Sequence, residues 1–298
     1  MSITDQAILM KCTISQWNAT IRDKKALKDF LTQEKMADDA GTLEKHLIAK
    51  TSLKSISDAA KNIRDMHRKM TMPWDLDGVG LLMNDKIFAY TKAMRELTSA
   101  FDEATTNFLK HYDVYISDSK LRLGNRFSAD EFPNIGELQY RFNVSIRPLP
   151  IPQSGHILAD LSESGIDTAV IDKAVKEAEN KALQRLWQQV YLRLKYLKER
   201  LSDPESRFKS TTIEKLDDFI DKLEDFNIYE SEELRSFVGF IRVHITNQDP
   251  REIRQFPETR NALLKHLDDA LIACKPFIGD VRDGRYIEED EDELRLAA

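Results

Sequence analysis

The chain has 298 residues, of which 41% are hydrophobic and 32% charged, with only 10 Gly and 9 Pro. This scarcity of Gly and Pro excludes collagen-like and low-complexity chains, and it disfavours a turn-rich β-sandwich. The formal net charge is −7, from 51 acidic and 44 basic side chains. This balance excludes a uniformly basic nucleic-acid-binding surface, although not a local basic patch.

The two cysteines, Cys12 and Cys274, lie near opposite ends of the chain. Their spacing fits neither a disulfide framework nor a zinc motif, so we expect two buried free thiols in a reducing compartment. No secretory signal is seen in the first residues, and no stretch of 18 uncharged apolar residues occurs. The sequence therefore predicts a cytoplasmic protein that does not span a membrane.

The first predicted elements are short. Polar and apolar residues alternate over Leu9–Trp17, which is typical of a strand. A helix is expected over Lys25–Met36, and a shorter one over Leu43–Ala49.

The strongest pattern is a heptad seam within Asp85–Tyr112, with side chains at alternating three- and four-residue spacing. Its members are Ile87, Tyr90, Met94, Leu97, Phe101, Ala104, Phe108 and His111. A second helical stripe runs over Leu53–Met70, and residues 71–83 join the two helices. Because the linker is short, we expect the two helices to pack antiparallel.

Gly and Pro punctuate residues 121–152, so the long helices should end there. Within this stretch, Arg141–Arg147 alternates as a strand does. We expect it to pair with the strand at Leu9–Trp17, because an unpaired strand leaves its amides unsatisfied. The pair would close an N-terminal domain of residues 1–152.

The second half returns to helices. Ile166–Leu201 contains no Pro or Gly, and a further helix follows with an apolar stripe that begins at Ile213. These two are expected to form a second antiparallel hairpin, and two more helices are predicted over Glu232–Ile245 and Glu258–Phe277.

The predicted fold class is therefore mainly α, with long antiparallel, coiled-coil-like helical hairpins and a small two-stranded β element. Residues 153–279 would form a C-terminal helical domain. Residues 280–298 contain eight acidic and three basic side chains, so this acidic tail carries −5 of the total charge and is expected to be disordered.

The common sequence signatures of catalysis are missing, including those of phosphate-binding loops, zinc proteases and serine hydrolases. The run Asp75–Gly78 begins like a calcium-binding loop, but Val79 and Lys86 occupy two positions that need oxygen ligands. We interpret that run as a turn. The six histidines lack metal-ligand spacing, and His111 is expected at the edge of the core with one hydrogen bond. The sequence predicts no enzyme, no metal site and no cofactor.

Residues 181–200 of the long helix concentrate basic and aromatic side chains. They are Lys181, Arg185, Tyr191, Arg193, Lys195, Tyr196, Lys198 and Arg200. One interpretation is a surface for a phosphate backbone and stacked bases. The favoured interpretation is the polar face of a hairpin, neutralised by Asp217, Asp221 and Glu224 of the next helix.

Several short motifs together resemble a family of phage and mobile-element proteins with no assigned function. They are Thr13–Trp17, Pro73–Leu82, Leu123–Pro133, Phe142 and the prolines Pro148 and Pro150. The resemblance covers the first half to two-thirds of the chain. Members are often encoded near MoxR-type AAA+ ATPases and von Willebrand factor A proteins. The resemblance implies an accessory role beside such an ATPase or against a host defence protein, and it brings no catalytic residues.

The leading hypothesis is a non-enzymatic accessory protein, either an adaptor or an inhibitor of a host complex. It would work by protein–protein contact and self-associate through its hairpins. Interface or structural roles are assigned to Trp74, Asp75, Asp77, Gly78 and Trp187. The alternative is a nucleic-acid-binding accessory factor that uses the basic helix 181–200.

Overall fold

The computed structural model describes residues 3–37, 39–74, 78–151, 169–203, 210–225 and 232–279. Most of them are helical, and the rest include a small antiparallel sheet. The predicted acidic tail, residues 280–298, lies outside the described residues.

The chain divides into two compact units, each assembled from separate stretches of sequence. Unit 1 contains Met1–Met10, Arg68–Ile87 and Pro148–Ala298, and unit 2 contains Lys11–His67 and Phe88–Arg147. The predicted domain boundary at residue 152 stays a prediction. The division into units differs from it in kind, because Met1–Met10 and Arg68–Ile87 group with the C-terminal half.

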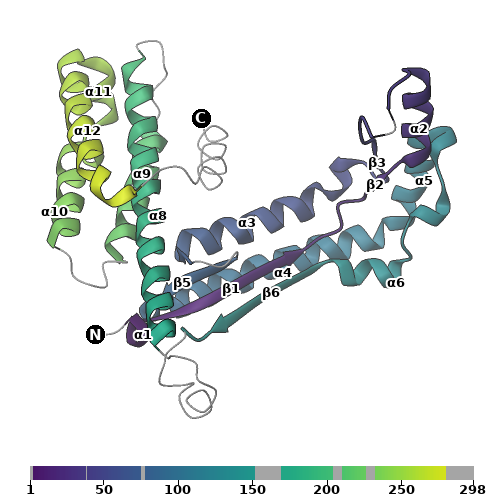
Figure 1. The fold of residues 1–298 in the computed structure, drawn as a ribbon, viewed down its shortest axis with the longest axis horizontal. Coiled ribbons are helices and arrows are strands. Elements are labelled where there is room, and N and C mark those ends of the chain that lie inside the picture. Colours follow the sequence, from purple (N-terminus) through teal and green to yellow (C-terminus); the bar gives the residue numbers. More distant parts are fainter. Residues whose placement is uncertain are drawn as a thin grey trace. The chain divides into compact units, whose positions relative to one another are not determined.

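The larger sheet has four strands, in the order β4-β5-β1-β6. They are β1 (Ala7–Ser15), β4 (Met72–Pro73), β5 (Val79–Met83) and β6 (Asn143–Leu149). The expected neighbours β1 and β6 do pair (Figure 1). The expectation of only two strands is wrong, because β4 and β5 form within the predicted linker and extend the sheet. A separate two-stranded sheet is also present.

Two glycines explain how the hairpin of β4 and β5 closes. Gly78 has a φ of +67°, a left-handed conformation that residues with a side chain rarely adopt. Gly80 lies opposite Pro73, and a Cβ at Gly80 would collide with the side chain of Thr71. The two glycines therefore indicated in the sequence that the chain turns back here. Strands β4 and β5 could not be recognised in the same way, because a strand is defined by its pairing with another strand.

Unit 1 is dominated by helices that follow the sheet in the chain. They are α8 (Ala169–Ser202), α9 (Ser210–Asp225), α10 (Glu232–Ile241), a π-helical turn η6 (Arg242–Thr246), α11 (Pro250–Gln255) and α12 (Pro257–Ile278). The short helix α1 (Ile3–Gln6) begins the chain. The four helices that the patterns predict are present, and α11 is an addition.

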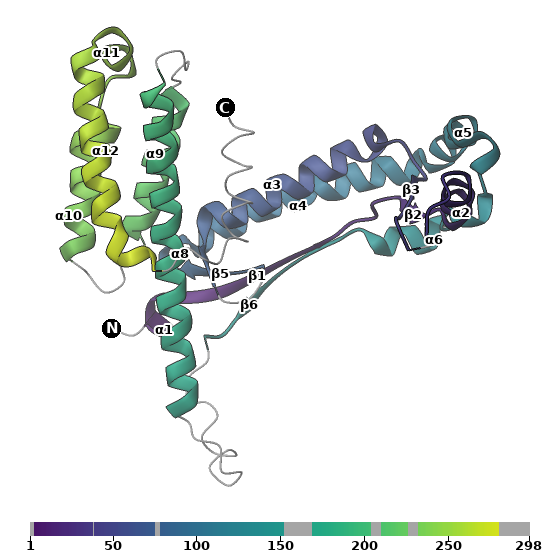
Figure 2. The ribbon, with the colours of Figure 1, turned by 45° about the horizontal axis from the view of Figure 1, so that its top comes forward.

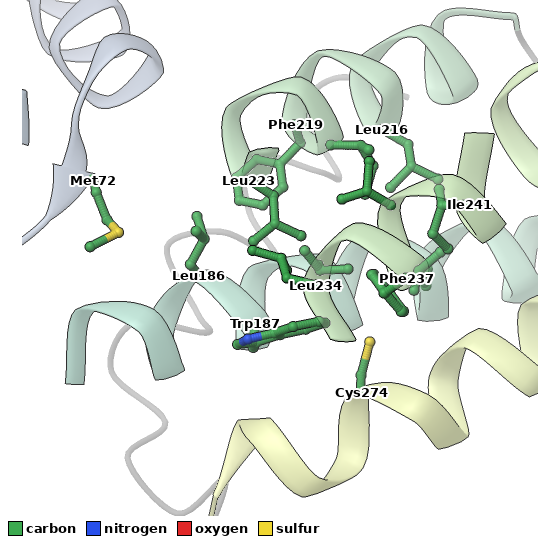
Figure 3. Packing of buried hydrophobic residues seen from close by; sticks show 14 of the residues in the cluster. Met72, Leu186, Trp187, Leu216, Phe219, Leu223, Leu234, Phe237, Ile241 and Cys274 are labelled. Atoms are coloured by element: carbon green, nitrogen blue, oxygen red, sulfur yellow. The ribbon is translucent and has the colours of Figure 1, made fainter. Parts of the chain in front are cut away.

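The core of unit 1 surrounds α8 (Figure 3). Helix α8 buries an apolar seam at Trp187, Val190, Leu194, Leu197 and Leu201. The helix also buries residues beside this seam, because it packs along α12 as well as against α9. The coiled-coil geometry of a hairpin between α8 and α9 stays a prediction.

Unit 2 contains most of the first-half helices. They are α2 (Lys24–Gln33), α3 (Lys54–Met70), α4 (Ile87–Lys110), α5 (Tyr112–Leu123) and α6 (Ile135–Leu138). Short 3-10 turns lie between them: η1 (Lys50–Leu53), η2 (Asn84–Lys86), η3 (Gly124–Arg126), η4 (Ala129–Glu131) and η5 (Gln139–Arg141). The last residues of α3, together with η2 and the start of α4, belong to unit 1.

The prediction of a helix over Leu43–Ala49 is wrong. Glu44–His46 forms strand β3, which pairs antiparallel with β2 (Thr20–Arg22) and places Lys45 opposite Ile21. The pairing joins stretches that are far apart in the sequence, so no local pattern announces it.

Helices α3 and α4 lie side by side (Figures 1 and 2), and four of the eight predicted seam residues are buried: Tyr90, Met94, Phe101 and Phe108. His67 and Tyr90 join the two helices, with His67 Nδ1 2.8 Å from the Tyr90 hydroxyl. The seam does not reach His111, which is exposed because α4 ends at Lys110; Tyr112 is buried instead. His111 keeps the one expected hydrogen bond, from its ring to a backbone carbonyl.

Candidate functional site

The predicted basic surface of α8 is partly engaged inside unit 1. The Arg185 guanidinium donates to the backbone carbonyl of Trp74 at 2.7 Å. The Arg193 guanidinium lies over the ring of Phe219, 4.2 Å from its centroid. Tyr191 is half-buried and packs against the core. These three side chains therefore support the packing of unit 1.

Toward the end of α8 the cations also have partners in the same unit. Lys198 forms an ion pair with Asp268 of α12 at 2.5 Å. Arg200 donates to the hydroxyl of Tyr196, one helical turn away, at 3.0 Å. An incoming phosphate would have to replace these contacts.

The acids that we expected opposite this surface have a different partner. Asp221 and Glu224 of α9 both pair with Arg242, at 2.5 and 2.8 Å. The hydrogen bond to Asp221 raises the pKa of Arg242. Lys181 and Lys195 are exposed on α8. Many of the α8 cations are engaged internally, but by groups other than the acids of α9 that we expected.

Of the residues to which we assigned interface or structural roles, Trp74 and Trp187 lie in the core and Gly78 is half-buried. Trp74 is buried, and its amide donates to the Val79 carbonyl at 3.1 Å, which closes the turn at Gly78. Trp187 is buried at the centre of the helices of unit 1. Asp75 and Asp77 lie outside the described residues.

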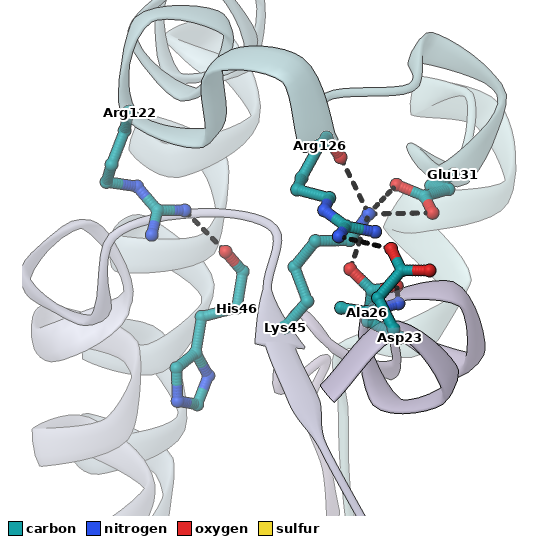
Figure 4. Close-up of polar contacts among 8 residues, drawn as sticks. Asp23, Ala26, Lys45, His46, Arg122, Arg126 and Glu131 are labelled. Atoms are coloured by element: carbon teal, nitrogen blue, oxygen red, sulfur yellow. Dashed lines mark hydrogen bonds and ion pairs between the residues drawn. The ribbon is translucent and has the colours of Figure 1, made fainter. Parts of the chain in front are cut away.

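Unit 2 contains a buried polar cluster that the sequence reasoning missed (Figure 4). Lys45 of β3 is only 9% exposed, and its Nζ lies 2.6 Å from Glu131 Oε2 and 3.9 Å from Asp23 Oδ2. It also donates to the Arg126 carbonyl at 2.9 Å. Asp23 in turn caps α2 by accepting from the Ala26 amide. One cation thus ties β3, α2 and the turns η3 and η4 together.

Two arginines extend this cluster (Figure 4). Arg126 pairs with Asp29 of α2 at 2.8 Å, and Arg122 of α5 donates to the carbonyl of His46 in β3. Charged groups therefore fix α2, β3, α5 and the turns η3 and η4 to one another. Since the residues come from three separate stretches (23–29, 45–46 and 122–131) and each is an ordinary surface type, no sequence signal identifies the cluster.

Two of these segments, α2 and α5, together with α6 and η5, carry or adjoin exposed apolar side chains, which we call the exposed end. It comprises Phe30, Met36, Val114, Leu121, Ile135 and Tyr140. Among the residues that the structure describes, these six are half of the twelve exposed large hydrophobic ones, although they come from only three short stretches of unit 2. Helices α2, α5 and α6 gather at one end of unit 2 in both views (Figures 1 and 2).

Helix α5 shows the pattern most clearly. It buries Tyr112 and Ser119 on one face, seven residues apart. Val114 and Leu121, also seven residues apart, lie on the opposite face and are 56% and 87% exposed. A helix with apolar residues on both faces is typical of one that packs against something on each side.

Other chemistry finds little support in the part of the chain that the structure describes. Cys12 and Cys274 are buried free thiols, and burial raises the pKa of both, that of Cys274 to about 12. Across the described ranges, no group of three or more His, Cys, Asp or Glu could hold a metal ion. None of the helices described is long and apolar enough to cross a membrane.

Comparison of the chain with protein-family models, with curated proteins and with solved structures gave no match in any of the three. The proposals below therefore rest on the sequence and on the geometry of the two units.

Proposed function

We propose that this protein acts by protein–protein contact and that the exposed end of unit 2 is its binding surface. The observation that supports this is that half of the exposed large hydrophobic side chains in the described part of the chain lie on or next to α2, α5 and the α6–η5 segment. Isolated exposed apolar residues are ordinary on protein surfaces, but their concentration in one region is typical of interaction sites.

The polar cluster strengthens this proposal, because it fixes α2 and α5, which carry Phe30, Val114 and Leu121. Lys45 and Arg126 join α2, β3 and the turns after α5. A surface held in place before binding loses less conformational entropy when a partner docks. The exposed end also offers aromatic rings at Phe30 and Tyr140, and such rings often dominate the energy of protein interfaces.

The proposed role is that of a cytoplasmic, non-enzymatic accessory protein of a phage or mobile element, which self-associates. It would serve as an adaptor or scaffold, or inhibit a host complex. The resemblance in residues 73–82 and 123–133 supports an AAA+ ATPase or a host defence protein as partner. The coiled-coil-like hairpins would then support the exposed end.

The alternative, nucleic-acid binding through helix 181–200, has less support. Arg185, Arg193 and Lys198 already make contacts inside unit 1. Binding to a phosphate backbone would break these contacts. The free energy lost with them would reduce the net electrostatic contribution to binding.

Replacing both Leu121 and Tyr140 with serine should weaken capture of the partner at least tenfold. Burying one such side chain contributes about 1.5–3 kcal/mol, and 1.4 kcal/mol is a tenfold change in affinity. The measurement is affinity purification of the tagged chain from its cells of origin, with the recovered proteins quantified by mass spectrometry.

The matched control is Val243→Ser, which removes a residue of unit 1 that is 60% exposed. Circular dichroism checks that both variants stay folded. We expect the same proteins with the wild-type chain and the control, and their depletion with the double variant. Equal recovery by all three, or depletion by the control alone, would place binding elsewhere.

A further inference from the structure

Helix α2 has an unbalanced positive charge. Lys24, Lys25 and Lys28 are exposed, and none forms an ion pair with another residue that the structure describes. The two nearby acids are already engaged, Asp23 with Lys45 and Asp29 with Arg126. Among the residues that the structure describes, the three lysines of α2 therefore have no carboxylate paired with them.

The position of these lysines adds to the imbalance. Lys24 and Lys25 occupy the first turn of α2, where the nearest carboxylate is that of the N-cap residue Asp23, which already pairs with Lys45. The amino end of a helix already carries a partial positive charge, so cations there are unfavourable and anions are favoured. An acidic segment that docks on this turn would offset both the charge of the lysines and the partial positive charge of the helix end. Phe30 and Met36 are exposed and lie close by in the chain, where they can contact apolar residues of such a segment.

The chain itself supplies a segment of this chemistry. Residues 280–298 include six consecutive acids, 288–293, with Ile287 before them and Leu294 after them. The cations of α8, which could have been its target, are largely engaged inside unit 1. Because residues 1–279 carry only −2, the acids of the tail are the main source of negative charge.

We infer that residues 280–298 of one copy dock on the α2 lysines of a second copy, so that two chains exchange their acidic segments. The contact is reciprocal, as expected for a twofold dimer, and each dimer contains it twice. The inference rests on the proposed self-association and names the surfaces that produce it.

Zero-length carbodiimide crosslinking of the full chain tests this directly, because it joins only carboxylates and amines that are in contact. An equal mixture of nitrogen-14 and nitrogen-15 chains identifies links between copies by mass. We expect links of mixed isotope between residues 288–293 and Lys24, Lys25 or Lys28. Links within one copy only, or none to these lysines, would overturn the inference.

A charge-reversal variant provides the second measurement. Lys24→Glu with Lys25→Glu and Lys28→Glu should weaken self-association at least tenfold in sedimentation analysis, and raising the salt concentration should weaken the wild type as well. The control is Lys61→Glu with Lys92→Glu and Lys110→Glu, an equal charge change at exposed positions of unit 2.

Equal self-association of the two triple variants would contradict the inference, and so would a wild-type chain that is monomeric throughout. Either result leaves partner capture through Leu121 and Tyr140 intact. The docking of the acidic segment and the proposed binding surface can therefore fail separately.

Discussion

Replacing Trp187 with alanine is expected to destabilise unit 1 by about 3–5 kcal/mol, the usual cost of removing a large aromatic side chain from a core. Trp187 is 7% exposed. Its ring stacks on Phe277 with centroids 4.6 Å apart, and it meets Phe237 edge-on at 4.9 Å. The substitution leaves a cavity where α8, α10 and α12 meet. Urea unfolding measures the loss.

The matched control is Phe256→Ala, which removes an aromatic side chain of unit 1 that is 49% exposed and should change stability far less. Hydrogen exchange locates the effect, and we expect faster exchange in α8, α10 and α12 of the Trp187→Ala variant. If both variants unfolded at the same urea concentration, the described core of unit 1 would be wrong.

Replacing Lys45 with methionine is expected to destabilise unit 2 by about 3–5 kcal/mol, because it leaves the buried carboxylate of Asp23 and the partly exposed one of Glu131 without their cation. The side chain of Asp23 is 9% exposed and that of Glu131 is 30% exposed, so neither is fully hydrated. The backbone carbonyl of Arg126 loses its donor as well. We expect faster hydrogen exchange in α2 and β3.

The control here is Lys54→Met, which breaks an exposed pair between Lys54 and Asp58 one helical turn apart. An exposed pair of this kind contributes only about 0.3–0.5 kcal/mol. Adding Glu131→Gln to the Lys45→Met variant should restore part of the stability, since it removes one of the stranded charges. Equal effects of the Lys45 and Lys54 variants would show that the polar cluster does not hold unit 2 together.

Helices could be predicted from the sequence where local periodicity determines them. The spacing of Tyr90, Met94, Phe101 and Phe108 indicated α4, and all four are buried. The uninterrupted run before Ser202 indicated α8 in the same way. These patterns indicate burial on one face of a helix. That face is determined by the spacing of residues close together in the chain, so it can be read from the sequence.

Features that depend on distant partners could not be read in this way. Strand β3 was predicted as a helix because its partner, β2, lies in another stretch of the chain. Strand β5 consists of apolar residues that suit either a loop returning to the core or a strand, and its pairing with β4 and β1 decides the matter. His111 followed the heptad spacing but is exposed, because α4 ends one residue earlier.

The candidate site shows the same division. The basic residues of α8 were found as a cluster, but a sequence does not tell that Arg193 covers Phe219 or that Lys198 pairs with Asp268. The exposed end was missed, although α5 gave a signal. Val114 and Leu121 repeat at seven residues on the face opposite Tyr112, a second apolar face that a search for one seam overlooks.

Photo-crosslinking from the exposed end tests the central claim most directly. A photoreactive amino acid replaces Tyr140, which is 81% exposed, or Val243 as the control, and the chain is irradiated in its cells of origin. If the exposed end binds protein, position 140 should give discrete protein adducts that position 243 does not. An absence of adducts at position 140, with or without adducts at 243, would contradict the account.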